Sequence, residues 1–176
     1  MATIDRKVFF EAIRAKPFGG KITTGQRAGL ETILDEWEAR KLKDLRWLAY
    51  ILATTKHETA HTMQPIKEKG GAAYFKRLYD IEGERPELAR KNGNTKPGDG
   101  VRYCGRGYVQ LTWKKNYERM GTLLDCDLAG QSDLAMRPDI AASILFEGMT
   151  KGRSMRGDFT GKSLEDYFNA RVDDPV

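Results

Sequence analysis

Both histidines of the chain, and two glutamates ten residues apart, lie within residues 56–69. His57-Glu58-Thr59-Ala60-His61 matches H-E-x-x-H, a motif that places two imidazoles on one face of a helix for zinc and uses the glutamate as a base. The stretch also fits a second chemistry, in which Glu58 and Glu68 face each other as the acid and the base of a glycoside hydrolase. The stretch alone leaves both possibilities open.

A zinc site would need a third ligand, and the chain has no third histidine. The longer motif H-E-x-x-H-x-x-G-x-x-H is absent. The remaining acidic candidates for that ligand are Glu82, Glu84 and Glu87. Because a five-residue motif also recurs by chance, we expect no metal, and we expect His61 to lie on a helix surface or to support the side chains of the site.

The chain is basic, with a net charge of +5 at pH 7 and a sequence pI of about 9.2. This excess suits an anionic partner, such as nucleic acid, a membrane surface or an acidic cell-wall polymer, and it also suits a merely soluble surface. No Lys/Arg cluster typical of nucleic-acid binding stands out, and the longest apolar run, residues 48–53, is too short to span a bilayer. We therefore expect neither nucleic acid nor stable membrane insertion. A non-catalytic wall-binding module would leave the paired glutamates without a purpose.

Cys104 and Cys126 are the only cysteines, which is too few for a disulfide framework. Residues 1–7 lack the apolar segment of a signal peptide. Both observations favour a protein that is made, and at first kept, in a reducing cytoplasm. The hydrophobic content of 40% and the length of 176 residues predict one soluble catalytic domain over residues 1–176, without a separate cell-wall-binding domain. We expect it to be a monomer.

The elements that would position the two glutamates are helices. Asp44 is expected to cap a helix that is apolar on most sides, which is typical of the central helix of a fold. This helix would carry Glu58 on its last turns and stop soon after Met63, because Pro65 interrupts it. A central helix is a rigid mount for a catalytic group. We therefore expect Glu58 to be partly buried and protonated, and Glu68, on a loop between two lysines, to be ionised.

Other helices follow from apolar residues at helical spacing and from capping residues. Those predicted are residues 5–16, a helix from Thr24 through Trp37, a short one from Pro86 to Arg90, one that Thr112 caps and that runs through Met120 and is ended by Gly121, one that starts at Pro138, and a last one after Ser163. Residues 74–79 fit either a short helix or strands. The rest of residues 66–100 is irregular, and such a segment inside a compact domain is usually functional.

Several of these segments together resemble the family 19 glycoside hydrolases, which are chitinases and related bacteriophage endolysins. The matching residues, in chain order, are the helix over residues 26–37, His57-Glu58-Thr59, Glu68, the loop at residues 93–100, and Gly105-Arg106-Gly107-Tyr108-Val109-Gln110-Leu111-Thr112. The order of these motifs is specific, and the resemblance covers nearly the whole chain and is closest to the compact endolysin branch. It implies a mostly α, lysozyme-like helical fold with a cleft between two lobes and little or no β structure.

The resemblance also implies a role for each matching residue. Glu58 would be the general acid and Glu68 the general base, and Thr112 would help to hold the attacking water. The positions that would bind the substrate in the cleft are His57, Tyr103, Gln110 and Asn116. The family inverts the anomeric carbon and needs no metal or other cofactor. If Glu68 is only a surface residue, Asp99 is the alternative base.

A basic chain without a signal peptide or a chitin-binding domain favours peptidoglycan over chitin as the substrate. We therefore predict an endolysin-type muramidase that cleaves β-1,4 bonds of peptidoglycan glycan strands in host-cell lysis. The alternatives are a chitinase and, from another class, an H-E-x-x-H zinc metallopeptidase. It would stay in the host bacterial cytoplasm until a separate pore releases it to the cell wall. Related proteins continue past the residues that match 171–176 with a further segment and a last helix, so we expect an incomplete cleft or a shortened form.

Overall fold

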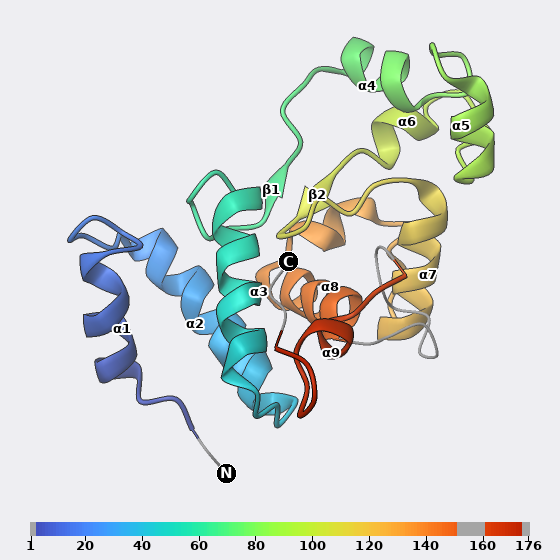
Figure 1. Cartoon of the computed structure of the whole chain (residues 1–176). Helices are drawn as coiled ribbons and strands as arrows, with labels where there is room; N and C mark the ends of the chain where they lie inside the picture. Colours follow the sequence, from blue (N-terminus) through green and yellow to red (C-terminus); the bar gives the residue numbers. More distant parts are fainter. Residues whose placement is uncertain (1–2, 151–160, 174–176) are drawn as a thin grey trace.

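The computed structural model describes residues 3–150 and 161–173, and most of that chain is helical (Figure 1). In chain order the helices are α1 (Arg6–Ala15), α2 (Thr24–Ala39), α3 (Leu45–Glu58), α4 (Ala72–Tyr79), α5 (Pro86–Lys91), α6 (Asp99–Arg102), α7 (Lys114–Leu124), the 3-10 helix η1 (Ser132–Met136), α8 (Pro138–Thr150) and α9 (Leu164–Tyr167). Two short strands, β1 (Ile66–Lys67) and β2 (Arg106–Gly107), form an antiparallel ribbon with Ile66 opposite Gly107. The predicted class, mostly α with little β structure, is confirmed for the described residues.

The first three helices start where the sequence predicts, because capping side chains fix them. Asp5 and Asp44 each accept a hydrogen bond from a backbone N–H in the first turn of α1 and α3. Thr23 and Gln26 form a capping box at the start of α2, in which each side chain binds the other residue's backbone N–H. The helices α5 and α9 also lie where the sequence predicts them, and residues 74–79 are helical as part of α4.

The prediction that α3 continues to Met63 is wrong, because the helix ends at Glu58. Three residues of the following turn have positive φ angles, which no α-helix contains: Ala60 (48°), His61 (68°) and Met63 (55°). The Thr59 hydroxyl donates to a carbonyl of the last helical turn and accepts a hydrogen bond from the backbone N–H of Met63. The hydroxyl thus binds backbone groups that have no partner within the helix. This left-handed turn ends the helix before Pro65.

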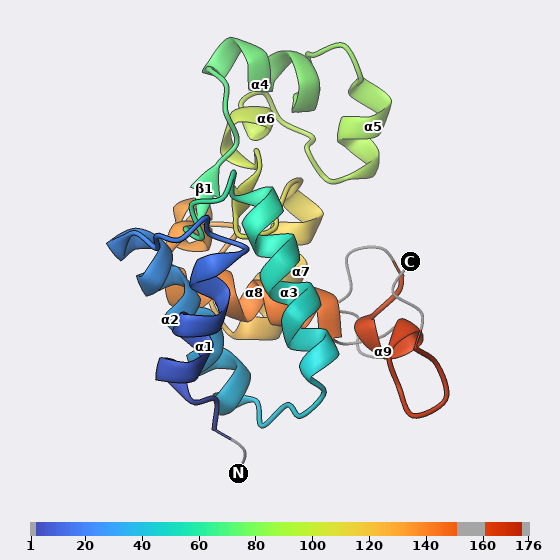
Figure 2. The same cartoon turned by 60° about the vertical axis from the view of Figure 1, so that its left-hand side comes forward.

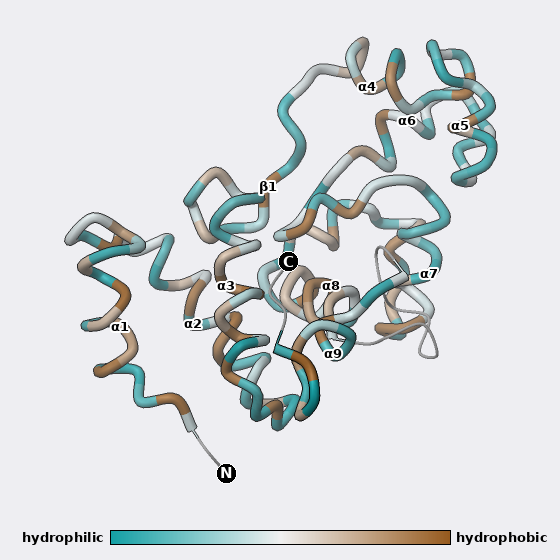
Figure 3. The backbone as a smooth tube through the Cα atoms, viewed as in Figure 1, coloured by the Kyte–Doolittle hydropathy of each residue, from teal (hydrophilic) through white to brown (hydrophobic). Residues whose placement is uncertain are grey.

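The central helix of the fold is α8 rather than α3. Its buried residues are Ala141, Ala142, Ile144, Leu145, Phe146, Glu147 and Gly148. Both α2 and α3 pack against it, and Figure 3 shows its apolar residues within the body of helices. By contrast, α3 leaves 61% of Leu45 and 42% of Tyr50 exposed. The prediction of α3 as the central helix is therefore wrong, since only one side of that apolar helix is covered.

The helices form two groups that both views keep apart (Figures 1 and 2). The larger group contains α1, α2, α3, α8 and α9 around one apolar core, while α7 and η1 contribute to a second core against α8 that includes Tyr117 and Met120. The smaller group contains α4, α5 and α6, where Phe75 and Ala89 are buried. The chain enters the smaller group after β1 and leaves it before β2, so the ribbon connects the two groups.

Two buried aspartates organise the start of α6 and the loop before it. Asp80 is 1% exposed, and one of its carboxylate oxygens accepts hydrogen bonds from the backbone N–H groups of Gly98 (2.8 Å) and Gly100 (3.1 Å). One carboxylate oxygen of Asp99 accepts hydrogen bonds from two successive backbone N–H groups of the loop, both at 2.9 Å. An irregular loop is predicted here, but these contacts order it and allow the short helix α6 to form.

The helix α7 begins at Lys114, so the prediction that Thr112 caps it is wrong. Instead, the side-chain oxygen of Asn94 accepts a hydrogen bond from the backbone N–H of Lys114 at 3.0 Å. The prediction that Gly121 ends the helix is also wrong, because α7 continues past it. A Cβ atom at Gly121 would lie 2.7 Å from the carbonyl oxygen of Cys126, so the glycine lets the chain that follows α7 pack closely against the helix.

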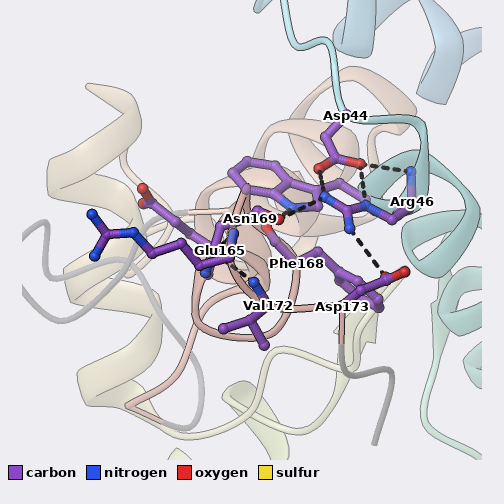
Figure 4. A network of polar contacts seen from close by, with 9 residues as sticks. Asp44, Arg46, Glu165, Phe168, Asn169, Val172 and Asp173 are labelled. Atoms are coloured by element: carbon purple, nitrogen blue, oxygen red, sulfur yellow. Dashed lines mark hydrogen bonds and ion pairs between the residues drawn. The ribbon is translucent and has the colours of Figure 1, made fainter.

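Polar contacts tie the last described residues to the start of α3 (Figure 4). Arg46 donates to the carboxylate of Asp173 at 3.0 Å and to the carbonyl of Asn169 at 3.2 Å. The indole nitrogen of Trp47 donates to the carbonyl of Phe168 at 2.9 Å. These contacts fix the first turn of α3, at the end opposite to the proposed acid.

Candidate active site

Glu58 is the last residue of α3, and its side chain is exposed where the helix ends. Its carboxylate forms no hydrogen bond or ion pair with another described residue. His57, which precedes it, is exposed as well. The prediction of a partly buried Glu58 is therefore wrong. Both views place this end of α3 beside β1, the strand that leads to Glu68 (Figures 1 and 2).

The turn after Glu58 is held against the first turns of α2. The side-chain nitrogen of Gln64 donates to the carbonyl of Gly25 at 2.6 Å. A Cβ atom at Gly29 would overlap the carbonyl oxygen of Met63, so only glycine lets the turn lie this close to α2. These contacts fix the C-terminal end of α3, and with it the backbone position of Glu58.

Glu68 follows β1 directly and is held by two residues distant in sequence. Its backbone N–H donates to the carbonyl of Gly105 at 2.8 Å, which adds one hydrogen bond to the ribbon. Its carboxylate accepts a hydrogen bond from the hydroxyl of Tyr79 at Oε1 (2.9 Å) and one from the backbone N–H of Gly105 at Oε2 (3.2 Å). Both oxygens of this half-buried side chain are therefore fixed by donors.

Gln110 braces the ribbon next to Glu68. Its side-chain nitrogen donates to the carbonyls of Ile66 at 3.1 Å and Gly107 at 3.3 Å, one on each strand. A Cβ atom at Gly105 would lie 2.8 Å from the side-chain oxygen of Gln110 and 3.2 Å from Oε2 of Glu68. A larger residue would therefore force one of these side chains to move, whereas the glycine lets the ribbon approach the carboxylate closely.

Thr112 and Asn116 continue this set of contacts. The Thr112 hydroxyl donates to the carbonyl of Gln110 at 2.7 Å, and the side-chain amide of Asn116 donates to the carbonyl of Thr112 at 2.8 Å. The hydroxyl proton of Thr112 is thus used within the protein, while its oxygen keeps lone pairs that can accept a hydrogen bond from water. The structure therefore joins Glu68, Gln110, Thr112 and Asn116 into one connected group.

Two residues considered from the sequence are buried away from this group. Tyr103 is 3% exposed, its ring packs against Tyr117, and its hydroxyl donates to the carbonyl of Ala129 at 3.1 Å. It belongs to the second core, so its assignment to the substrate-binding surface is wrong. Asp99 is 7% exposed, and its carboxylate is bonded to backbone N–H groups. This makes Asp99 a structural part of its loop rather than an alternative base.

The histidines are not arranged as the H-E-x-x-H motif requires. His57 lies in the last turn of α3, whereas His61 lies in the left-handed turn, so the two rings do not project from one helix face. Nδ1 of His61 lies 3.0 Å from the ammonium nitrogen of Lys56, which can only donate. Within residues 3–150 and 161–173, no group of three or more His, Cys, Asp or Glu side chains is placed to hold a metal ion.

Tyr79 could not be assigned to the site from the sequence. It is the last residue of α4, and its ring packs edge-on against Trp113 with the ring centroids 5.0 Å apart. Burial and the hydrogen bond to Glu68 raise the pKa of Tyr79 above its ordinary value, so the phenol keeps its proton. No sequence signal tells which aromatic residue of α4 reaches Glu68, because the answer depends on how the smaller group of helices folds back.

Comparison with known proteins places the chain in a family. A family model described as chitinase class I, of glycoside hydrolase family 19, matches residues 24–151, which include both candidate glutamates. The chain belongs to glycoside hydrolase family 19. Basic endochitinase CHB4 from Brassica napus is 31% identical over 98 residues, which are 54% of this chain and 32% of that relative.

The chain is also similar to solved structures. A crystal structure of a chitinase C mutant matches 81% of this chain and 55% of that chain, with a TM-score of 0.51 and 21% identity. A bacterial family 19 chitinase matches 72% of this chain and 60% of that chain, with a TM-score of 0.46 and 22% identity. The likeness to chitinase C confirms the predicted mostly α, lysozyme-like fold of family 19. The chain spans about a third of the endochitinase and about half of chitinase C.

Proposed function

We propose that this chain hydrolyses β-1,4 bonds of a glycan and inverts the anomeric carbon. The observation that carries the proposal is the contrast between Glu58 and Glu68. Glu58 is exposed at a helix end and has no partner among the described residues, whereas Glu68 has both carboxylate oxygens held by donors. A general acid must be reachable by the leaving oxygen, and a general base must be held in a fixed position, which is what these two surroundings provide.

Glu58 is the proposed general acid. It donates its proton to the glycosidic oxygen as the bond from that oxygen to the anomeric carbon breaks. Its exposed position lets the leaving oxygen approach.

Glu68 is the proposed general base. The Tyr79 hydroxyl and the Gly105 N–H stabilise its negative charge and fix the plane of the carboxylate. Glu68 takes one proton from a water molecule whose oxygen bonds to the anomeric carbon on the face opposite the leaving group, and the products are two glycan ends. The hydroxyl oxygen of Thr112 can accept the other hydrogen of that water and so hold it in line.

Peptidoglycan is the proposed substrate, because the segment that contains Glu68 carries a net positive charge. Residues 67–102 carry nine Lys and Arg against six Asp and Glu, and two lysines flank Glu68. Two of the six acids, Asp80 and Asp99, are buried and bonded to backbone N–H groups, so the surface is more basic than the composition alone suggests. Peptidoglycan carries carboxylates on its muramic acid units and peptide stems, whereas chitin is neutral, so this charge favours peptidoglycan.

Chitin hydrolysis is the second candidate, and the names of the similar proteins favour it. The two are separated by mass spectrometry of the products from purified peptidoglycan and from chitin oligosaccharides. A muramidase leaves N-acetylmuramic acid at each new reducing end, whereas a chitinase releases N-acetylglucosamine oligomers and leaves peptidoglycan intact. Released amino groups without new reducing ends would overturn the glycosidase proposal in favour of an amidase or a peptidase.

We also propose that the protein acts as a bacteriophage endolysin, kept in the host cytoplasm until a separate pore releases it to the wall. Among the described residues, no helix is long and apolar enough to cross a membrane. Cells that express the protein should stay intact until chloroform permeabilises the inner membrane, and then lyse. Cells with the Glu68→Gln variant should not lyse after chloroform. Lysis by the wild type without permeabilisation would overturn the need for a pore.

A further inference from the structure

We propose that Tyr79 is a positioning residue for the base, so that the smaller group of helices takes part in the reaction. This inference rests on the proposed function, in which Glu68 activates water. The Tyr79 hydroxyl donates to Oε1 of Glu68 at 2.9 Å, and among the described residues it is the only partner of that oxygen. Gly105 binds the other oxygen, Oε2, at 3.2 Å.

Contacts on several sides fix the orientation of the Tyr79 ring. The ring stacks on Phe75 with centroids 6.5 Å apart and meets Trp113 edge-on with centroids 5.0 Å apart. The carbonyl of Tyr79 accepts a hydrogen bond from the side chain of Asn94 at 2.9 Å, which links the end of α4 to the loop before α6. The hydroxyl therefore reaches Glu68 from a rigid support that belongs to the smaller group of helices.

The need for such a residue follows from the flexibility of a glutamate carboxylate. The last torsion of a glutamate side chain has a broad energy minimum, so a single hydrogen bond leaves the carboxylate free to turn. If Gly105 were the only donor, the carboxylate of Glu68 could rotate about that hydrogen bond. With Tyr79 as a second donor, both oxygens are held and the plane of the carboxylate is fixed. A base with a fixed plane keeps its remaining lone pairs directed at one water position, and such positioning contributes strongly to rate.

Tyr79 itself stays protonated, so that it can donate to the base. A hydrogen bond to the charged form of a carboxylate stabilises that form. Burial and the bond to Glu68 raise the pKa of Tyr79, so it remains a donor near neutral pH. Other titratable groups that act on Tyr79 or lie around Glu68 are Tyr74, Arg85, Lys67, Cys104 and Arg106.

Tyr79→Phe tests the proposal, because it keeps the ring and removes only the hydroxyl. We expect kcat to fall by about tenfold or more, as for a lost hydrogen bond to a charged group, with KM changed by less than about twofold. The variant loses a hydrogen bond that favours the charged form of the carboxylate. The acid limb of the pH profile of kcat should therefore move to higher pH.

Tyr74→Phe is the matched control. Tyr74 lies on the same helix and is 38% exposed, and its hydroxyl has no hydrogen bond to a described residue. Its variant should keep the wild-type kcat and pH profile. Thermal melts of both variants show whether the fold is intact.

A second variant keeps the test decisive if Tyr79→Phe does not fold. Tyr79→3-fluorotyrosine makes the phenol a stronger donor, so the acid limb should move to lower pH. An unmoved acid limb, with or without a fall in kcat, would overturn the proposal and leave Tyr79 as a packing residue. Glu68→Gln separates the role of Tyr79 from the proposed function. If Glu68→Gln is inactive while Tyr79→Phe equals the wild type, only the role of Tyr79 fails. If Glu68→Gln is active, the proposed function fails as well.

Discussion

Glu68 and Gly105 bind each other twice: the backbone N–H of Glu68 donates to the carbonyl of Gly105 at 2.8 Å, and the N–H of Gly105 donates to the carboxylate of Glu68 at 3.2 Å. The pairing of β1 with β2 therefore also fixes the position of the Glu68 carboxylate. The proposed base thus depends on a residue that has no side chain of its own.

Gly105→Ala should displace the proposed base. The new Cβ atom would lie 3.2 Å from Oε2 of Glu68 and 2.8 Å from the side-chain oxygen of Gln110, so one of these groups must move. We expect turnover to fall by about 10²-fold, as for a catalytic group misplaced by about 1 Å. Gly71→Ala is the control, because nothing lies within 4 Å of its Cβ position and its φ is −97°. Equal kinetics of the two variants would contradict this prediction.

Glu58→Gln and Glu68→Gln should each lower turnover by about 10²- to 10⁴-fold, the range that general acid–base catalysis supplies. Glu58 has no partner among the described residues, so its variant should keep the wild-type Tm. Glu11→Gln, at an exposed position of α1, is the control and should retain full activity. Wild-type turnover by Glu68→Gln would remove Glu68 from the mechanism.

The stereochemistry tests the same pair of glutamates independently. NMR of fresh product should show an inverted anomeric configuration, because water attacks opposite the leaving group. Glu68→Ala should regain turnover with azide and yield an inverted glycosyl azide, since the small anion enters the space of the lost carboxylate. A retained configuration would instead mean a covalent intermediate or assistance by the substrate.

Thr112→Val keeps the shape of the side chain and removes the hydroxyl. We expect turnover to fall by about 10²-fold, as when a positioned polar group is lost, and the free energy of unfolding to fall by about 1 kcal/mol with the hydrogen bond to Gln110. Thr122→Val is the control, since its hydroxyl donates to the carbonyl of Glu118 within α7. It should lose similar stability but no turnover. Unchanged turnover in Thr112→Val would mean that the hydroxyl contributes only to stability.

Gly29→Ala should destabilise the turn that follows the proposed acid. The added Cβ would overlap the Met63 carbonyl, and overpacking of this kind costs about 1–3 kcal/mol. Gly25→Ala, in the same helix, meets only the Gln64 side chain at 3.9 Å. It should be neutral or stabilising by up to about 1 kcal/mol through helix propensity. Urea unfolding of both variants measures the difference, and equal stabilities would count against the close approach of turn and helix.

Chelators should leave the activity unchanged, because the proposed reaction uses two carboxyl groups and water. The measurement is the rate on peptidoglycan after dialysis against EDTA and 1,10-phenanthroline. His61→Ala should likewise retain turnover, since His61 lies outside the contacts around Glu68. Loss of activity on chelation, restored by zinc, would revive the H-E-x-x-H interpretation.

The starts of helices could be predicted from the sequence because capping is local. Asp5, Thr23 and Asp44 sit next to the turns that they cap. The end of α3 could not, because the left-handed turn after Glu58 is stabilised by packing on Gly29, which lies far away in sequence. The prediction of α3 as the central helix fails for a related reason, because apolar composition does not tell which sides of a helix are covered.

Some residues of the candidate site could likewise be predicted from the sequence, and others could not. Glu68, Gln110, Thr112 and Asn116 come together as their motifs imply, since the ribbon brings the two segments side by side. Tyr103 lies next to the glycine-rich motif, but adjacency in sequence does not fix the side to which a ring turns, and it points into the second core.

Cys104, the residue before Gly105, is fully buried, and burial raises the pKa of its thiol. Cys126 is partly exposed. A buried, protonated thiol reacts with a labelling reagent only when the surrounding backbone opens. The chain therefore contains a natural chemical probe next to its proposed base. The labelling rate of Cys104, set against that of Cys126, would report how often the ribbon opens, and whether a bound glycan holds it closed.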